Sequence, residues 1–111
     1  MSGDAVETLL DDSAFRFAVA MGIVETGADA SLKLYARTDN NNYLGATLTG
    51  YAAILYLYQR ALRKEDLGRV NAFWNAFTTV SNVAAGMALG ENYSNTQLLG
   101  FGLISAGIFL I

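Results

Sequence analysis

The chain has 111 residues, of which 53% are hydrophobic and only 15% are charged, and its net charge is −3. The length predicts a single domain, the charged fraction is well below the roughly 25% of a soluble domain, and the acidic balance excludes nucleic acid as an expected partner. Because the chain contains no Cys and no His, disulfides, thiolate or imidazole metal sites and cysteine nucleophiles are excluded, and we expect no metal, no cofactor and no enzymatic activity.

The first 16 residues are acidic and lack the basic region that opens a signal peptide. We expect residues 1–16 to form an N-terminal arm or a short surface helix that precedes a transmembrane domain over residues 17–111. Asp12 or Ser13 can cap the first helix of that domain, because a short side chain with an oxygen acceptor binds the free N–H groups of a helix N-terminus.

Four apolar stretches follow, each about 16–20 residues long, close to the length that a helix needs to cross a bilayer. The chain is therefore predicted to be an all-α, polytopic membrane protein with four transmembrane helices. The mean hydropathy of +0.31 is low for this class, which we interpret as polar side chains that face the interior; a soluble helical bundle remains the alternative. The predicted helices are Phe17–Ala36, Leu44–Leu62, Val70–Leu89 and Thr96–Ile111.

Glu25 lies in the middle of the first predicted helix. A carboxylate at bilayer depth costs roughly 2.5–3.5 kcal/mol on insertion scales, so it is expected to face a bundle interior or a wet cavity. Asp29 and Lys33 follow at spacings of four on the same face and can pair with each other, which leaves Glu25 without a local partner. Three interpretations of Glu25 stay open: a titrating group that binds a proton or a cation, part of a buried structural cluster, or a contact with the lipid surface or with a partner in an assembly.

Polar and aromatic side chains mark the second and third helices. Tyr51 lies closer to mid-depth than the other tyrosines of its helix, so its hydroxyl needs a partner. The third helix carries a polar stripe with Trp74 beside it, and in hydrocarbon such a stripe must face another helix or water. The stripe consists of Asn71, Asn75, Thr78 and Asn82.

Small residues gather toward the C-terminal end, where they allow helices to approach closely. Gly90 also suits the C-cap of the third helix. The candidate helix-packing residues are Gly86, Gly90, Gly100, Gly102, Ala106 and Gly107.

The distribution of Lys and Arg predicts a single orientation, with both termini on the cytoplasmic side. Five basic residues fall on the side of the termini and the second connector, against two on the other side. The first group is Arg16, Arg60, Arg63, Lys64 and Arg69, and the second is Lys33 and Arg37.

From about Phe17 to Ile111 the chain resembles the small multidrug resistance family, the four-helix members of the drug/metabolite transporter superfamily. The matching features are Glu25, Tyr51, the run Gly68–Asn75 with Asn71 and Trp74, the turn Gly90–Glu91, and the fourth helix over Leu98–Ile108. The resemblance implies proton-coupled export of quaternary ammonium or guanidinium compounds by an antiparallel dimer, with Glu25, Tyr51, Asn71 and Trp74 at the proton- and cation-binding site. Asn71 stands where the family usually has a tyrosine, and Asp29 is an additional acid.

Two hypotheses follow for this multi-pass protein of the lipid bilayer. The first is a small transporter in which Glu25 exchanges a proton for a cation, while Tyr51 and Trp74 offer aromatic faces to that cation. The second is a structural membrane subunit without transport activity, such as an accessory subunit of a membrane complex or a virion membrane protein. The single orientation favours the second hypothesis, and either protein is expected to form homo- or hetero-oligomers.

Overall fold

The computed structural model describes residues 3–111, and all of the regular structure in that range is helical. The predicted all-α class is therefore confirmed, and each of the four apolar stretches coincides largely with one helix, the fourth continuing past α5 into a 3-10 turn. The elements are α1 (Gly3–Asp11), α2 (Ser13–Thr38), α3 (Asn41–Leu62), α4 (Leu67–Ala88), α5 (Asn95–Gly107) and a final 3-10 turn (Ile108–Leu110).

Capping residues explain where the helices begin and end. Asp12 caps α2, as predicted, by accepting a hydrogen bond from the Phe15 amide at 3.3 Å. Asp39 ends α2 in the left-handed region, with a φ of 55°. Gly90 follows the last turn of α4 with a φ of 94°, a conformation that glycine adopts without strain. The α5 helix ends at Gly107, earlier than predicted, and the division of the chain into residues 1–16 and 17–111 stays a prediction.

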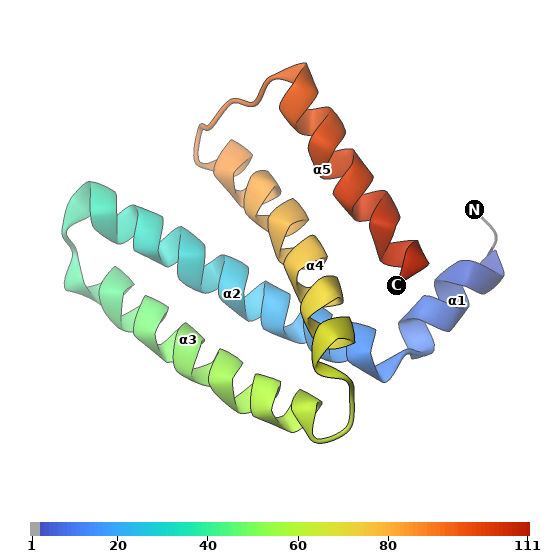
Figure 1. Cartoon of the computed structure of the whole chain (residues 1–111). Helices are drawn as coiled ribbons and strands as arrows, with labels where there is room; N and C mark the ends of the chain where they lie inside the picture. The colour runs from blue at the N-terminus through green and yellow to red at the C-terminus, as the bar shows by residue number, and fades with distance from the viewer. Residues whose placement is uncertain (1–2) are drawn as a thin grey trace.

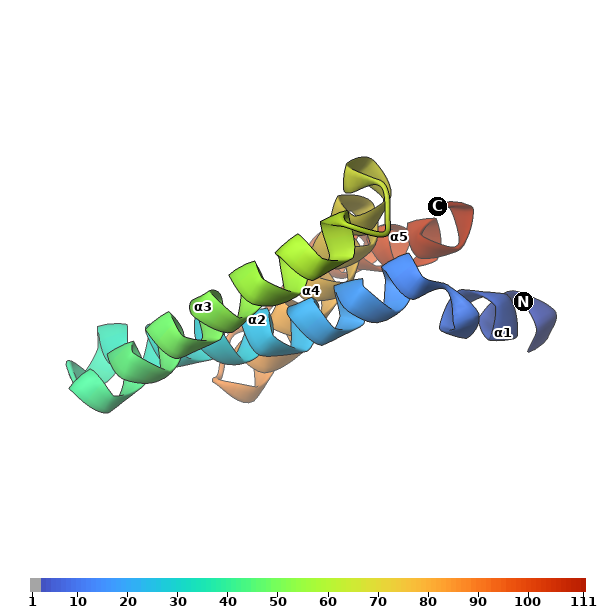
Figure 2. The same ribbon diagram turned by 90° about the horizontal axis from the view of Figure 1, so that it is seen from below.

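The α2 helix is the centre of the molecule. The α3 helix runs antiparallel along one side of α2, α4 crosses α2, and α5 returns beside α4 (Figure 1). The Cα atoms span 45 × 38 × 20 Å, and the short dimension corresponds to about two helix diameters. The molecule is therefore a thin slab (Figure 2), in which α2 holds α3 and α4 together.

Two glycines let α3 and α4 approach α2 closely. A Cβ atom on Gly22 would lie 2.3 Å from Phe77 Cδ1, at the place where α4 crosses α2. A Cβ atom on Gly50 would lie 2.8 Å from the Cβ of Ala28, in the α2–α3 contact. Both helix contacts therefore depend on the absence of a Cβ atom at a glycine.

The hydrophobic core is small and lies near the N-terminal ends of α2 and α4. The ring of Phe73 is buried against Phe15, with their centroids 5.5 Å apart in an edge-to-face arrangement. The buried cluster consists of Ala14, Ala18, Met21, Ala61, Val70 and Phe73. Three of these six residues are alanines, so the core itself buries little apolar area.

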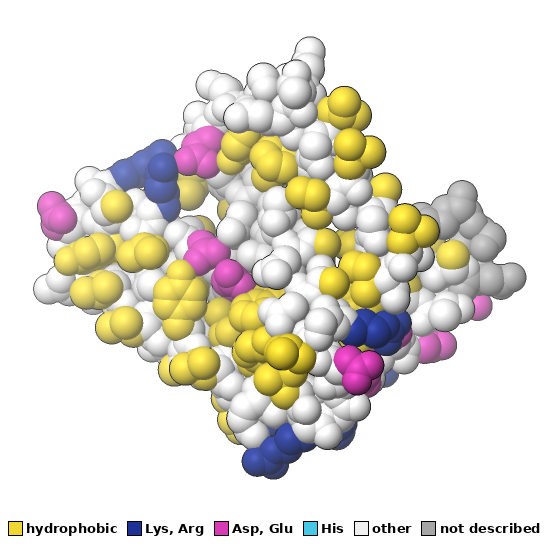
Figure 3. Space-filling model, in the orientation of Figure 1, with side chains coloured by type: hydrophobic (Ala, Val, Ile, Leu, Met, Phe, Trp, Pro, Cys, Tyr) yellow, Lys and Arg dark blue, Asp and Glu magenta, His cyan; other side chains and the backbone are white. Residues whose placement is uncertain are grey.

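Many large hydrophobic side chains lie on the surface instead. On α3 they include Leu48 and Leu55, at 62% and 70% exposure, and on α5 Leu99 and Leu103, at 65% and 66%. Figure 3 shows hydrophobic side chains over α3 and α5 on the face in view. Among residues 3–111, no single helix combines the length with the apolar character that crossing a membrane requires.

Candidate functional site

Glu25, Asp29 and Lys33 lie along one side of α2, each one turn beyond the last. The structure gives each a different environment: Glu25 meets α4, Asp29 meets both α3 and α4, and Lys33 meets the α4–α5 connector. The partners on α4 share the same spacing of four, since Trp74, Thr78 and Asn82 follow one another along a single face of that helix. The site thus lies where this row of side chains on α2 faces the row on α4.

Glu25 is half-buried and faces Trp74 and Thr78. The indole N–H of Trp74 and the hydroxyl of Thr78 are both buried, and neither completes a hydrogen bond of normal geometry within the described chain. Both nevertheless lie close enough to act on the Glu25 carboxylate. Glu25 also belongs to none of the ion pairs found among residues 3–111. Its carboxylate therefore has two nearby donors, an exposed side and no cationic partner.

Asp29 connects three helices. One carboxylate oxygen accepts a hydrogen bond from the Tyr51 hydroxyl of α3 at 2.5 Å, and the other accepts one from Asn82 Nδ2 of α4 at 2.9 Å. Hydrogen bonds to a charged group are worth about 1.5–3 kcal/mol each, so this junction is a main polar contact between α2 and its neighbours. Tyr51 is also close enough to sense the charge of Glu25, but its hydroxyl is directed to Asp29.

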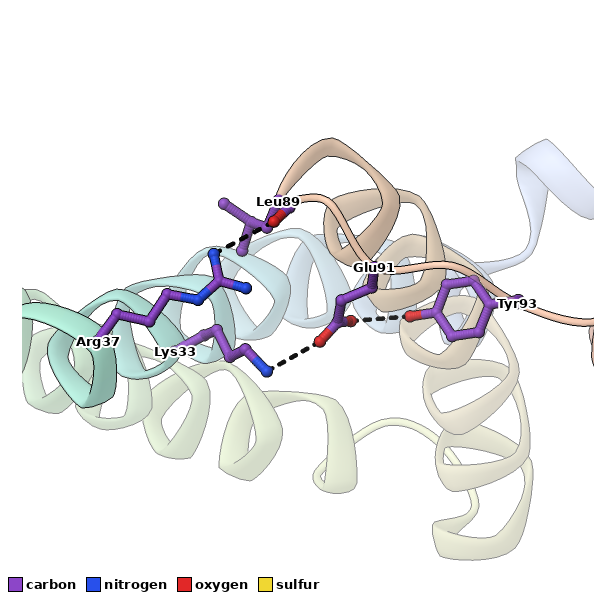
Figure 4. A network of polar contacts seen from close by, with 5 residues as sticks. All are labelled: Lys33, Arg37, Leu89, Glu91 and Tyr93. Carbon is purple, nitrogen blue, oxygen red and sulfur yellow. Dashed lines mark hydrogen bonds and ion pairs between the residues drawn. The ribbon is translucent and has the colours of Figure 1, made fainter.

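The expected pairing of Asp29 with Lys33 is wrong. Lys33 Nζ instead lies 2.9 Å from Glu91 Oε2, in the connector that follows α4 (Figure 4). The Tyr93 hydroxyl donates to the other Glu91 oxygen at 3.0 Å, and Arg37 donates to the Leu89 carbonyl at 3.2 Å. The hydrogen bond from Lys33 has the largest effect on the pKa of Glu91, and the one from Tyr93 has the second largest. Both lower this pKa below its usual value. Lys33 therefore joins α2 to the connector that follows α4.

A cavity of about 170 Å³ lies between Asp29 and the connector. Asp29, Lys33, Asn82 and Glu91 supply the polar part of its wall. Gly86 lies under this connector: a Cβ atom there would be 2.3 Å from Glu91 Oε1 and 2.5 Å from the Tyr93 hydroxyl. The glycine thus allows the two side chains to lie directly on α4.

The polar stripe of α4 divides among several partners. Asn71 Nδ2 donates to the Tyr58 hydroxyl at 2.6 Å, and the Tyr58 ring packs edge-on against Trp74 with centroids 5.0 Å apart. Asn75 is exposed, Thr78 is buried and Asn82 binds Asp29. Of the four candidate site residues, the structure brings Glu25 and Trp74 together, joins Tyr51 to them through Asp29, and gives Asn71 a partner on α3.

The small residues lie in varied places, and their role in helix packing stays a prediction. Gly86 is buried within the molecule, and Gly90 lies in the connector beyond α4. Gly100 and Gly107 are half-buried, and Gly102 and Ala106 are exposed. A Cβ atom on Gly100, Gly102 or Gly107 would meet no atom within 4 Å.

Sequence reasoning missed the roles of Asp29, Thr78 and Glu91. Trp74, Thr78 and Asn82 follow one another at steps of four, as Glu25, Asp29 and Lys33 do, so matching the two rows of side chains could have paired the helices. No comparable pattern points to Glu91, because its contact with Lys33 depends on how the connector folds.

The family model described as Small Multidrug Resistance protein matches residues 14–104. The match covers most of the chain, including Glu25, Tyr51, Asn71 and Trp74, and the chain therefore belongs to this family. Membership implies an integral, multi-pass membrane protein of the four-helix type, and a transporter of drugs or cations rather than an enzyme. Proteins of this family typically act as dimers. No curated protein and no solved structure matches the chain at a significant level of similarity.

Proposed function

Because the chain belongs to the small multidrug resistance family, we propose that it exports cationic small molecules in exchange for protons, with Glu25 as the exchanging group. The observation that carries this proposal is the state of Glu25: a half-buried carboxylate with no cationic partner, faced by the unpaired donors of Trp74 and Thr78. A structural carboxylate would be expected to have fixed partners, as Asp29 does. Glu25 is therefore available to bind a proton or a cation in turn.

Aromatic side chains beside Glu25 suit a quaternary ammonium or guanidinium substrate. A cation is attracted to the face of Trp or Tyr with an energy of about 0.5–2 kcal/mol, depending on desolvation. Trp74 lies close to Glu25, and the Tyr58 ring packs edge-on against the Trp74 ring. Tyr51 is close enough to Glu25 to add a third aromatic ring to the site. Asn71 contributes indirectly, because its side-chain amide donates a hydrogen bond to the Tyr58 hydroxyl.

The exchange follows from charge balance. When Glu25 is ionised, the carboxylate attracts a cation, and the donors of Trp74 and Thr78 support the negative charge. When a proton binds, the charge disappears and the attraction for the cation is lost. Since proton and cation need the same carboxylate, occupation by one excludes the other and couples their movements.

Proton release tests the proposal directly. In detergent solution at weak buffering, tetraphenylphosphonium or guanidinium added to the wild-type protein should release protons, and Glu25→Gln should abolish that release because the amide cannot titrate. Glu7→Gln, the same chemical change on the exposed surface of α1, is the matched control and should release protons normally. If the wild-type protein releases none across a range of such cations, the structural-subunit hypothesis is favoured, which the uneven distribution of Lys and Arg also supports.

We further propose that both termini and the α3–α4 connector lie on the cytoplasmic side, because five of the seven basic residues fall there. The protein is proposed to act as a homo- or hetero-oligomer in the lipid bilayer, with small residues of α4 and α5 in helix contacts. The acidic segment 1–16 would then remain outside the transmembrane domain 17–111.

A further inference from the structure

Two grooves on the surface of the molecule meet near the start of α2, where they share Arg16 and Ala20. One groove, of about 400 Å³, lies between α2 and the end of α3. The other, of about 290 Å³, lies between α1 and α2. A ligand held at Arg16 therefore has access to both grooves.

The walls of both grooves are largely apolar. Phe17 and Leu57 line the first groove and pack against the hydrophobic core. Val19 and Ile23 line the second groove, and Ile23 is 61% exposed. From Arg16 to Ile23 this groove follows about 10 Å of α2, since an α-helix rises about 1.5 Å per residue. Each groove is thus a strip of hydrocarbon surface that begins at a basic side chain.

The shared end of the grooves has unused capacity to bind an anion. Lys64 lines the first groove, is exposed, and belongs to none of the ion pairs formed by residues 3–111. The Arg16 guanidinium donates to the Leu10 carbonyl at 2.6 Å and lies 3.5 Å from Asp11 Oδ1. A guanidinium has five N–H donors, so these two contacts leave most of its donors free. The pair with Asp11 is exposed on both sides, and such surface pairs are weak.

The acids that follow Lys64 do not form an ion pair with it. Glu65 and Asp66 lie close enough to Arg69 to act on its charge, and the Arg69 guanidinium itself binds Asp12. Figure 3 shows basic side chains at the end of the molecule where α3 passes into α4. The mouth of the first groove is therefore basic, while its length is apolar.

We propose that the two grooves bind one anionic phospholipid of the bilayer, with its phosphate on Arg16 and Lys64 and one acyl chain in each groove. Membership of a membrane-protein family brings this surface into contact with lipid. Basic pockets between membrane helices are known to bind acidic headgroups, and Arg and Lys both bind phosphate oxygens. A zwitterionic lipid has the same phosphate, but its choline brings a positive charge toward two basic side chains. The proposal is independent of the role of Glu25.

Native mass spectrometry of the full-length protein tests the proposal. The protein is released from detergent with equal amounts of phosphatidylglycerol and phosphatidylcholine that have the same acyl chains, and the bound lipids are counted. The wild type should retain one phosphatidylglycerol with a preference of about tenfold. Arg16→Gln and Lys64→Gln should each lower this preference about threefold, and the double variant should remove it. Arg63→Gln removes the same charge from the same end of the molecule but lines neither groove, so it should retain the preference.

Ala20→Leu tests the apolar part of the site, because it adds bulk to the wall that both grooves share. It should lower the retention of both lipids, whereas Ala52→Leu, the same change on the exposed surface of α3, should not. Glycerol 3-phosphate, which has a phosphate but no acyl chain, should not displace the lipid when it is added in equal amount.

Several results would overturn the proposal. Equal retention of the two lipids by the wild type would exclude a site for an anionic headgroup. An effect of Arg63→Gln as large as that of Lys64→Gln would show general attraction to a basic surface. Normal retention in Ala20→Leu, or displacement by glycerol 3-phosphate, would show that the grooves hold no acyl chain.

Discussion

Gly22→Ala should destabilise the protein and disturb the cation site together, because Gly22 lies where α4 crosses α2. The added Cβ atom would lie 2.3 Å from Phe77 Cδ1, 2.9 Å from Phe77 Cε1 and 3.2 Å from Thr78 Oγ1. The first distance is roughly 1 Å short of ordinary van der Waals contact, so either the ring or the helix must move. Overpacking of this kind costs about 1–3 kcal/mol, while replacing a helical glycine with alanine returns about 0.5–1 kcal/mol.

The expected net effect is a loss of about 1–2 kcal/mol in the free energy of unfolding. It can be measured in a mild detergent by titration with a denaturing one, with far-UV circular dichroism as the first probe. The fluorescence of Trp74, the single tryptophan, provides a second probe close to the crossing. Since Thr78 shares the clash, the affinity for cations should fall as well.

Gly27→Ala is the matched control, because it changes the same residue type in the same helix and its Cβ atom would meet nothing within 4 Å. That variant should be more stable than the wild type by up to about 1 kcal/mol. If Gly22→Ala were as stable as Gly27→Ala, the close approach of α2 and α4 at Gly22 would be refuted, and with it the contact between Glu25 and α4.

Three further predictions follow from the same structure. Single cysteines introduced at Asp39 and Glu65 should react with impermeant reagents from opposite sides of the membrane, and equal labelling of both positions from both sides would contradict a single orientation. Thr78→Val should weaken cation binding, because it removes a buried hydroxyl that acts on the Glu25 carboxylate; cation affinity measured beside the wild type checks this, and an unchanged affinity would contradict it. Burial raises the pKa of Asp12, but the hydrogen bonds that Asp12 accepts from Arg69 and from the backbone outweigh burial and hold its pKa below 3.8. The ionised Asp12 therefore stabilises the folded protein fully above pH 3.8. This stabilisation is lost as the pH falls through the lowered pKa. Unfolding midpoints measured from about pH 5 to pH 2 should therefore converge for the wild type and Asp12→Asn at the acidic end, and a constant difference would contradict this.

Local patterns in the sequence were enough to place the helices and their caps. Apolar stretches of suitable length located all four main helices, and Asp12 and Gly90 marked a beginning and an end because capping depends on only a few neighbouring residues. The expectation that Glu25 faces the interior followed from the cost of placing a carboxylate in hydrocarbon. Resemblance in the spacing of Glu25, Tyr51 and Trp74 identified the family, which the match over residues 14–104 confirms.

The tertiary structure decided which side chains meet. Tyr51 binds Asp29 and not Glu25, and Lys33 binds Glu91 and not Asp29. These choices depend on the register between helices, which is set by the crossing at Gly22 and by the fold of the α4–α5 connector. The periodicity of side chains along a helix indicates which face a residue occupies. It does not indicate how far a neighbouring helix is shifted along its axis. The pairing of the two acids with their partners therefore became visible only once α2, α3 and α4 were packed together.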